Sequence, residues 1–227
     1  MTFTDATKYP KLAKKDSDGS YCYVVQRRIS QYVSAFCVKI GISANMATFI
    51  DFIFAVLAAL SLALGHPLTG VLFIQIFGIW SCVDGEVARA SNQENKLGDF
   101  YDTMTDRSAE YLFVGALMLW MNKTSLDYSW GPVFFAYMGS VFMITASSEK
   151  FRSVYHANYP KAQHEHIFSW FCAGSDTRFL YLSLGIIAYG ITDNAAIIYW
   201  LFVLQAILLT INFIFRMWKI YQLKQIR

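Results

Sequence analysis

The chain has 227 residues, of which 56% are hydrophobic, 17% aromatic and 15% charged. This composition is too apolar for an ordinary soluble domain of this length and predicts an integral membrane protein. The formal net charge is +3, but the basic residues are spread over several segments, which argues against nucleic acid and favours anionic lipid headgroups as partners.

The chain begins with a polar arm, residues 1–20, and one membrane domain is expected over 21–227. Because the arm lacks an apolar core, no cleavable signal peptide is expected. Between 24 and 40, apolar residues at 25, 29, 32, 33 and 36 recur at helical spacing, which predicts an amphipathic helix in the membrane interface. Two roles stay open for this helix: an anchor for the first span, or a cover over an active site.

Six apolar stretches follow, each to be compared with the ~20 residues that cross the hydrocarbon of a bilayer. They lie near 44–64, 68–83, 107–121, 131–148, 179–192 and 195–215. The expected fold is therefore all-α: a polytopic membrane protein with six transmembrane helices and an N-terminal interfacial amphipathic helix. The third and fourth helices are expected to extend beyond the membrane into their polar flanks.

The basic residues predict the orientation. The loops at 65–70, 122–130 and 191–194 share one side and contain a single basic residue, Lys123. Lys and Arg near span ends favour the cytoplasmic side, so both termini and the segment 84–107 are expected to be cytoplasmic. The four cysteines include no CxxC pair, so neither a disulfide framework nor a zinc site is expected.

The segment 81–106, SCVDGEVARASNQENKLGDFYDTMTD, holds the main candidate site. Asp102 and Asp106 are four residues apart and share one face of a helix, while Asp84 lies near the end of the preceding span. Carboxylates so close to a membrane are costly unless they are paired, hydrated or bound to a cation. If the three converge, their oxygens suit Mg²⁺ or Mn²⁺ together with a phosphate-bearing substrate.

Two glycines favour this interpretation. Gly85 and Gly98 leave room beside the aspartates for a nucleotide or a helix backbone. Arg89, one helical turn beyond Gly85, could hold a phosphate, although a snorkelling arginine at the membrane edge would give the same pattern. The alternative for the aspartates is a set of solvated helix ends paired with nearby cations.

The segment resembles the signature of the CDP-alcohol phosphotransferase family, D-x2-D-G-x2-A-R-x8-G-x3-D-x3-D. Seven positions match at fixed spacing: Asp84, Gly85, Ala88, Arg89, Gly98, Asp102 and Asp106. Upstream, residues 44–48, ANMAT, are similar to the P-N-x-x-T that opens the first span of the family, with Ala44 in place of proline. The resemblance implies an enzyme that transfers a phosphoalcohol unit from a CDP-alcohol to an acceptor hydroxyl and releases CMP, in phospholipid or headgroup synthesis.

The resemblance also implies roles for single residues. Asp84, Asp102, Asp106 and position 81 would bind Mg²⁺ or Mn²⁺, and Asp106 would also act as the general base. The CDP pocket would be lined by Gly85, Ala88, Arg89 and Gly98. A CDP-linked lipid as donor, membrane lipids as surroundings and a homodimeric assembly are further implications.

Ser81 departs from the family pattern, which has an aspartate there. A neutral hydroxyl is a poorer ligand for a hard divalent cation than a carboxylate. Glu86 points to another helix face and the Cys82 thiol is soft, so neither is a good substitute. Three interpretations stay open: a working enzyme with a looser or single-metal site, a catalytically impaired member that acts as a CDP-lipid-binding or scaffold protein, or an inactivating substitution introduced for study.

A second basic group concerns the acceptor. Lys150, Arg152 and Arg178 are expected on the same cytoplasmic side as the aspartates, and the resemblance implies that residues at such places bind the phosphate of a phosphorylated acceptor. The preference of basic residues for the cytoplasm explains the same three residues without a substrate. A transporter is a third class of function, but it would be expected to carry charges deep in several spans.

Overall fold

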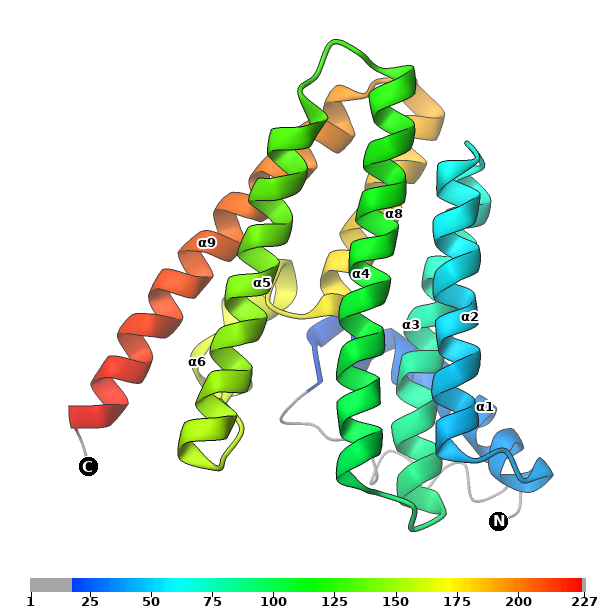
Figure 1. The fold of residues 1–227 in the computed structure, drawn as a ribbon, viewed down its shortest axis with the longest axis vertical. Helices are drawn as coiled ribbons and strands as arrows, with labels where there is room; N and C mark the ends of the chain where they lie inside the picture. The colour runs from blue at the N-terminus through cyan, green and yellow to red at the C-terminus, as the bar shows by residue number, and fades with distance from the viewer. Residues whose placement is uncertain (1–17, 226–227) are drawn as a thin grey trace.

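The structure, a computed structural model of the chain, describes residues 18–225. Within this range the chain consists of helices and their connections, without β-strands (Figure 1). The predicted all-α class is confirmed. Most of the polar arm predicted over 1–20 lies outside the described residues. A π-helical turn, η2 (Cys22–Gln26), leads into α1 (Arg27–Ile40).

Six long helices run alongside one another in alternating directions (Figure 1). They are α2 (Ala44–Ala63), α3 (Pro67–Ala90), α4 (Lys96–Thr124), α5 (Trp130–Tyr155), α8 (Ser175–Thr192) and α9 (Ala196–Gln225). Two short helices, α6 (Lys161–His164) and α7 (His166–Phe171), connect α5 to α8. As predicted, α4 and α5 extend beyond their apolar stretches into polar flanks.

Local signals set the turns at the end of the bundle that carries the motif. α1 ends at Gly41, whose φ of 80° is easily adopted by glycine. The Ser43 side chain accepts a hydrogen bond from the Met46 amide at 3.3 Å and caps α2, while the Asn95 side chain accepts one from the Gly98 amide at 2.8 Å and caps α4. The helices α2 and α4 both begin at the lower end of the bundle in Figure 1.

Among the described helices, four are long and apolar enough to cross a membrane: α2, α3, α5 and the Ala196–Gln222 part of α9. Their outer faces expose large apolar side chains such as Leu60, Phe135 and Trp200, as expected where lipid replaces water. α4 is more polar because its first half carries the acidic residues of the motif. The membrane class is thus confirmed, and the number of six spans stays a prediction.

The packing order of the helices differs from their order in the sequence. α2 packs extensively along both α3 and α4, whereas α3 and α4 touch each other sparsely. Phe77, Phe113 and Phe179 meet edge to face, with ring centroids 5.3 to 5.7 Å apart, and join α3, α4 and α8 in the core. α2 therefore forms one wall of the region between the motif helices.

The N-terminal helix α1 has its polar face buried and its apolar face exposed. Ile29, Tyr32 and Phe36 are exposed, while Ser30 and Ser34 are fully buried against α3. Such an arrangement suits a helix whose outer face contacts lipid. α1 also packs directly on the motif helix α3, as a cover over the site would require.

Candidate active site

Asp84 lies near the end of α3 and is held in place by α2. Its carboxylate accepts a hydrogen bond from the Thr48 hydroxyl at 2.9 Å and another from the Gly85 amide at 2.6 Å. The side chain is buried, at 6% exposure. Thr48 belongs to the segment that resembles the opening of the first span of the family, so this segment and the aspartate motif meet in space.

Asp106 and Ser81 connect α4 to α3. The Ser81 hydroxyl donates a hydrogen bond to Asp106 Oδ1 at 3.1 Å, and Arg107 Nη2 lies 3.7 Å from Asp106 Oδ2. Asp102, one turn earlier on α4, is partly buried. The structure therefore brings position 81 together with Asp106, as the motif implies, although the contact is made by a serine.

Asp51 on α2 is a further candidate residue, which the sequence interpretation missed. Its side chain is 2% exposed, and its Oδ1 has no hydrogen-bond partner among the described residues. The charges that act on it are those of Asp106, Asp84 and Asp102. A carboxylate inside an apolar stretch is itself a functional signal in a membrane protein, and this signal could have identified Asp51.

These carboxylates suit a divalent cation by charge and by donor type. In residues 18–225, however, no three acidic, histidine or cysteine side chains already lie close enough together to ligate one ion. Hard cations prefer carboxylate oxygens, and the buried Oδ1 of Asp51 has no hydrogen-bond partner among the described residues, so it is free to bind a ligand. The donor set thus fits Mg²⁺ or Mn²⁺, provided that its side chains turn toward a common point.

Arg89 is a candidate for binding an anion. Its Nε and Nη2 are buried without a hydrogen-bond partner among the described residues. A Cβ on Gly85 would come within 3.1 Å of Arg89 Nη1, so the glycine lets the guanidinium lie close to the α3 backbone. At Gly98 the atoms nearest to an added Cβ belong to Asn95, the first at 3.6 Å, which is an ordinary contact. Ala88 is partly buried on the same helix.

The three basic residues predicted for the acceptor do not form one cluster. Arg152 is partly buried and pairs with Asp99 at 2.8 Å, and Lys150 beside it is exposed. Arg178 is buried and bonds to Glu110 instead. Asp99 and Glu110 are eleven residues apart on α4, roughly 16 Å along the helix axis. One small anion cannot contact both arginines in this arrangement.

Arg178 and Glu110 form a buried ion pair. Arg178 donates to both Glu110 oxygens, at 2.5 and 2.8 Å, and through Nη1 to the Cys172 carbonyl at 2.8 Å. Glu110 also accepts hydrogen bonds from Arg107 at 2.8 Å and from the Tyr137 hydroxyl at 3.2 Å. Arg107 also lies near Asp106, the candidate general base, so it connects this network to the motif.

Lys161 is a second residue that the sequence interpretation missed. It lies in α6, partly buried, where burial and the positive charges of Arg216 and Arg107 lower its pKa to about 8. Arg216 itself forms a fully buried pair with Glu165 at 2.5 Å. Nothing in the local sequence shows that α6 folds back toward α4 and α9, so only the tertiary structure reveals this concentration of cations.

Glu86 on α3 binds three side chains of α1. It accepts hydrogen bonds from Arg27 at 2.9 Å, from Ser30 at 2.7 Å and from Ser34 at 2.5 Å. The predicted orientation of Glu86 away from the metal candidates is therefore found, and its charge is neutralised by Arg27. The pair holds α1 across the outer side of α3.

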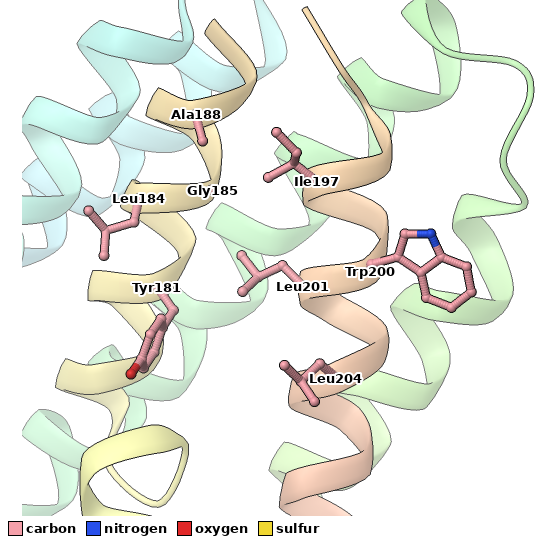
Figure 2. A pocket seen from close by; sticks show the side chains of 8 residues that line it. All are labelled: Tyr181, Leu184, Gly185, Ala188, Ile197, Trp200, Leu201 and Leu204. Atoms are coloured by element: carbon pink, nitrogen blue, oxygen red, sulfur yellow. The ribbon is translucent and has the colours of Figure 1, made fainter. Parts of the chain in front are cut away.

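An apolar hollow between α8 and α9 is separate from the aspartates (Figure 2). It is lined by residues such as Leu184, Gly185 and Leu201, and none of its lining residues is charged. A site for a diphosphate needs cations or oriented hydrogen-bond donors, and this hollow has no charged lining residue. The motif region is therefore the better candidate for the active site.

Comparisons with known proteins identify the class of this chain. A family model described as CDP-alcohol phosphatidyltransferase matches residues 41–218. The chain therefore belongs to the CDP-alcohol phosphatidyltransferase family, and the resemblance drawn from the motif is confirmed. The matched range includes all seven motif positions, Ser81 and Asp51.

Three relatives illustrate the similarity. A bifunctional IPC transferase and DIPP synthase from Archaeoglobus fulgidus is 34% identical over 140 residues, or 62% of this chain and 27% of that protein. A protein of the same name from Thermococcus kodakarensis is 32% identical over 142 residues, or 63% and 32%. An archaetidylinositol phosphate synthase from Pyrococcus horikoshii is 30% identical over 87 residues, or 36% and 46%. The chain thus matches less than half of the length of each relative.

Proposed function

We propose that this chain transfers a phosphoalcohol unit from a CDP-alcohol to an acceptor hydroxyl and releases CMP, in phospholipid or headgroup synthesis. The observation that carries the proposal is the contact between the motif residues Ser81 of α3 and Asp106 of α4, together with Arg89 on α3, whose Nε and Nη2 are buried without a partner among the described residues. Family membership supports the transferase class. We further propose that the donor is a CDP-linked lipid, because the site lies where the bundle meets the membrane surface.

The diphosphate of the donor is assigned to Arg89. Its two unpartnered nitrogens can each donate to a phosphate oxygen, which would satisfy donors that are otherwise buried at a cost. Gly85 supports this assignment because its missing side chain leaves the guanidinium close to the backbone. Ala88 and Gly98 are assigned to the CDP pocket on the motif match alone.

Mg²⁺ or Mn²⁺, when bound, would neutralise the charge that develops on the diphosphate oxygens as the phosphoanhydride breaks. Asp84 and Asp102 would hold the ion together with Asp106, and Ser81 could add a neutral oxygen. Asp84 is already oriented by Thr48 and by the Gly85 amide. Fixed carboxylates lose less freedom when they bind a substrate complex.

The reaction proposed for this site is a displacement at phosphorus. The acceptor oxygen forms a bond to the alcohol-side phosphorus of the donor, the phosphoanhydride bond breaks, and the electron pair of that bond leaves with CMP. The hydroxyl proton passes to Asp106, which must lie within hydrogen-bond reach of the bound acceptor. Ser81 holds one oxygen of Asp106, and Arg107 lies farther from the other, which leaves that oxygen the freer one.

We propose that the acceptor carries a phosphate. Burial, and after it the positive charges of Arg216 and Arg107, lower the pKa of Lys161 to about 8, and an anion close to these cations would be favoured. We also propose Lys150 and Arg152 as residues that bind the acceptor phosphate at a more exposed edge of the same site. Arg178 is assigned to positioning instead, because it is buried and each of its three nitrogens already donates to Glu110 or to the Cys172 carbonyl.

Orientation and assembly complete the proposal. The motif, α1 and the basic segments lie at one end of the bundle, and we place this end and both termini on the cytoplasmic side. A homodimer is proposed from the family resemblance.

A second candidate function is binding of a CDP-lipid without turnover. The observation that favours it is Ser81, which puts a neutral group where the motif has a carboxylate. A protein of this kind would keep Arg89 and the carboxylates but release no CMP.

The two candidates are separated by CMP release from purified full-length protein with Mg²⁺ or Mn²⁺. The donors are CDP-diacylglycerol, CDP-archaeol and small CDP-alcohols, and the variants are Ser81→Asp and Asp106→Asn. Release by the native chain that disappears in Asp106→Asn supports the transferase. Release only by Ser81→Asp, or donor binding without release by any variant, supports the impaired member.

A further inference from the structure

The family motif has an aspartate at the position of Ser81, and the structure places another carboxylate, that of Asp51, near this position. α2 and α3 form an antiparallel hairpin, and their register is fixed where Thr48 donates its hydrogen bond to Asp84 at 2.9 Å. Asp51 follows Thr48 by three residues, and Ser81 precedes Asp84 by three. Three residues of an α-helix rise about 4.5 Å along its axis. Because α2 and α3 are antiparallel, going forward from Thr48 and going backward from Asp84 lead in the same direction, so Asp51 and Ser81 lie at the same level.

Asp51 faces the motif carboxylates at this level. Thr48, Asp51 and Ala55 share one face of α2 by their spacing, and Asp51 and Ala55 are buried. Among the charges that act on Asp51, that of Asp106 is the strongest, followed by those of Asp84 and Asp102. Asp106 is also the residue that Ser81 contacts at 3.1 Å.

The surroundings of Asp51 do not explain it as a structural residue. Its Oδ1 is buried and has no hydrogen-bond partner in the described part of the chain. The other buried acidic residues at this end of the bundle are satisfied: Glu86 bonds to Arg27 and two serines, and Glu110 to Arg178. A buried polar oxygen without a hydrogen bond costs free energy, and a ligand that binds this oxygen would offset the cost.

We propose that Asp51 replaces the missing motif aspartate as a metal ligand, so that Asp51 from α2 and Asp84, Asp102 and Asp106 from α3 and α4 bind the divalent cation. This inference rests on the proposed function and deepens it, because it explains how a chain with serine at position 81 keeps four carboxylates. Ser81 then orients Asp106 instead of binding the ion directly.

The test is Mn²⁺ binding to the full-length protein in detergent, measured from the electron paramagnetic resonance signal of free Mn²⁺. Asp51→Asn is expected to weaken binding about tenfold or more, since affinity depends on the number of charged ligands. Asp51→Asn with Ser81→Asp moves the carboxylate back to the motif position and is expected to restore most of the affinity. Asp193→Asn, an exposed residue at a positive φ that asparagine tolerates, is the matched control, and Asp102→Asn is the positive control.

Thermal unfolding separates a ligand from a structural residue. In EDTA, Asp51→Asn is expected to unfold at a temperature no lower than that of the native chain, because a neutral amide replaces an acidic group buried near other carboxylates, and to gain less from added Mn²⁺. Native affinity in Asp51→Asn while Asp102→Asn binds weakly would overturn the inference and leave the proposed function standing. A native chain that neither binds Mn²⁺ nor releases CMP would overturn the proposed function, and the inference with it.

Discussion

Replacing Arg178 by methionine tests whether this arginine binds substrate or supports the fold. Arg178 and Glu110 are 2% and 1% exposed, so solvent does not screen their pair. Breaking a buried pair typically costs about 3–5 kcal/mol, because the remaining charge stays buried. Arg107 and Tyr137 would still donate to Glu110, so we expect the lower end of this range, about 3 kcal/mol of the free energy of unfolding.

The assay is reversible unfolding of the full-length chain in detergent micelles, followed by circular dichroism. Glu110→Gln combined with Arg178→Met removes the stranded charge and should recover part of the loss. Arg152→Met is the matched control, since its partly exposed pair with Asp99 contributes at most about 1 kcal/mol. If Arg178→Met were as stable as the native chain and raised only the KM for a phosphorylated acceptor, the structural role assigned to Arg178 would be wrong.

Three further predictions concern the site. Arg89→Met should raise the KM for the CDP-alcohol about tenfold or more without changing that for the acceptor, as steady-state kinetics with each substrate varied would show; an unchanged donor KM would exclude Arg89 from the diphosphate. Glu86→Gln should weaken the attachment of α1 by about 1–3 kcal/mol, seen as faster hydrogen exchange in α1; equal exchange would show that Ser30 and Ser34 suffice. The KM for a phosphorylated acceptor should rise as the pH passes through about 8, because Lys161 then loses its proton, and Lys161→Met should abolish this pH dependence; a dependence that persists in the variant would assign it to another group.

The helices could be predicted from the sequence because their signals are local. The apolar stretch 44–64 corresponds to α2 (Ala44–Ala63), and Ser43 and Asn95 cap helices where the chain leaves its turns. The spacing of the motif also predicted that Asp102 and Asp106 share one helix face, and both lie on α4. The extensions of α4 and α5 beyond the membrane stretches were likewise expected from their polar flanks.

The rest of the site depends on contacts between segments far apart in the chain. The register of α2 against α3, fixed where Thr48 bonds to Asp84, puts Asp51 and Ser81 at the same level of the bundle, and no periodicity in the sequence reveals this register. Arg178 was grouped with Lys150 because all such residues favour the same side of a membrane, but its buried partner is Glu110. The charge around Lys161 arises from the packing of α6 near Arg216 and Arg107. Sequence spacing predicts which residues share a helix face, but it cannot show which face meets which neighbour.

The most direct test of the proposed reaction follows the phosphorus atom on the alcohol side of a labelled CDP-alcohol. Full-length protein, donor, a phosphorylated acceptor and Mg²⁺ should yield labelled phosphodiester product and an equal amount of unlabelled CMP, and Asp106→Asn should yield neither. Label that appears only in a hydrolysis product, or CMP formation that does not depend on the acceptor, would contradict transfer to an acceptor hydroxyl. Donor binding by the folded native chain without any CMP would show that the protein binds the CDP-alcohol and does not turn it over.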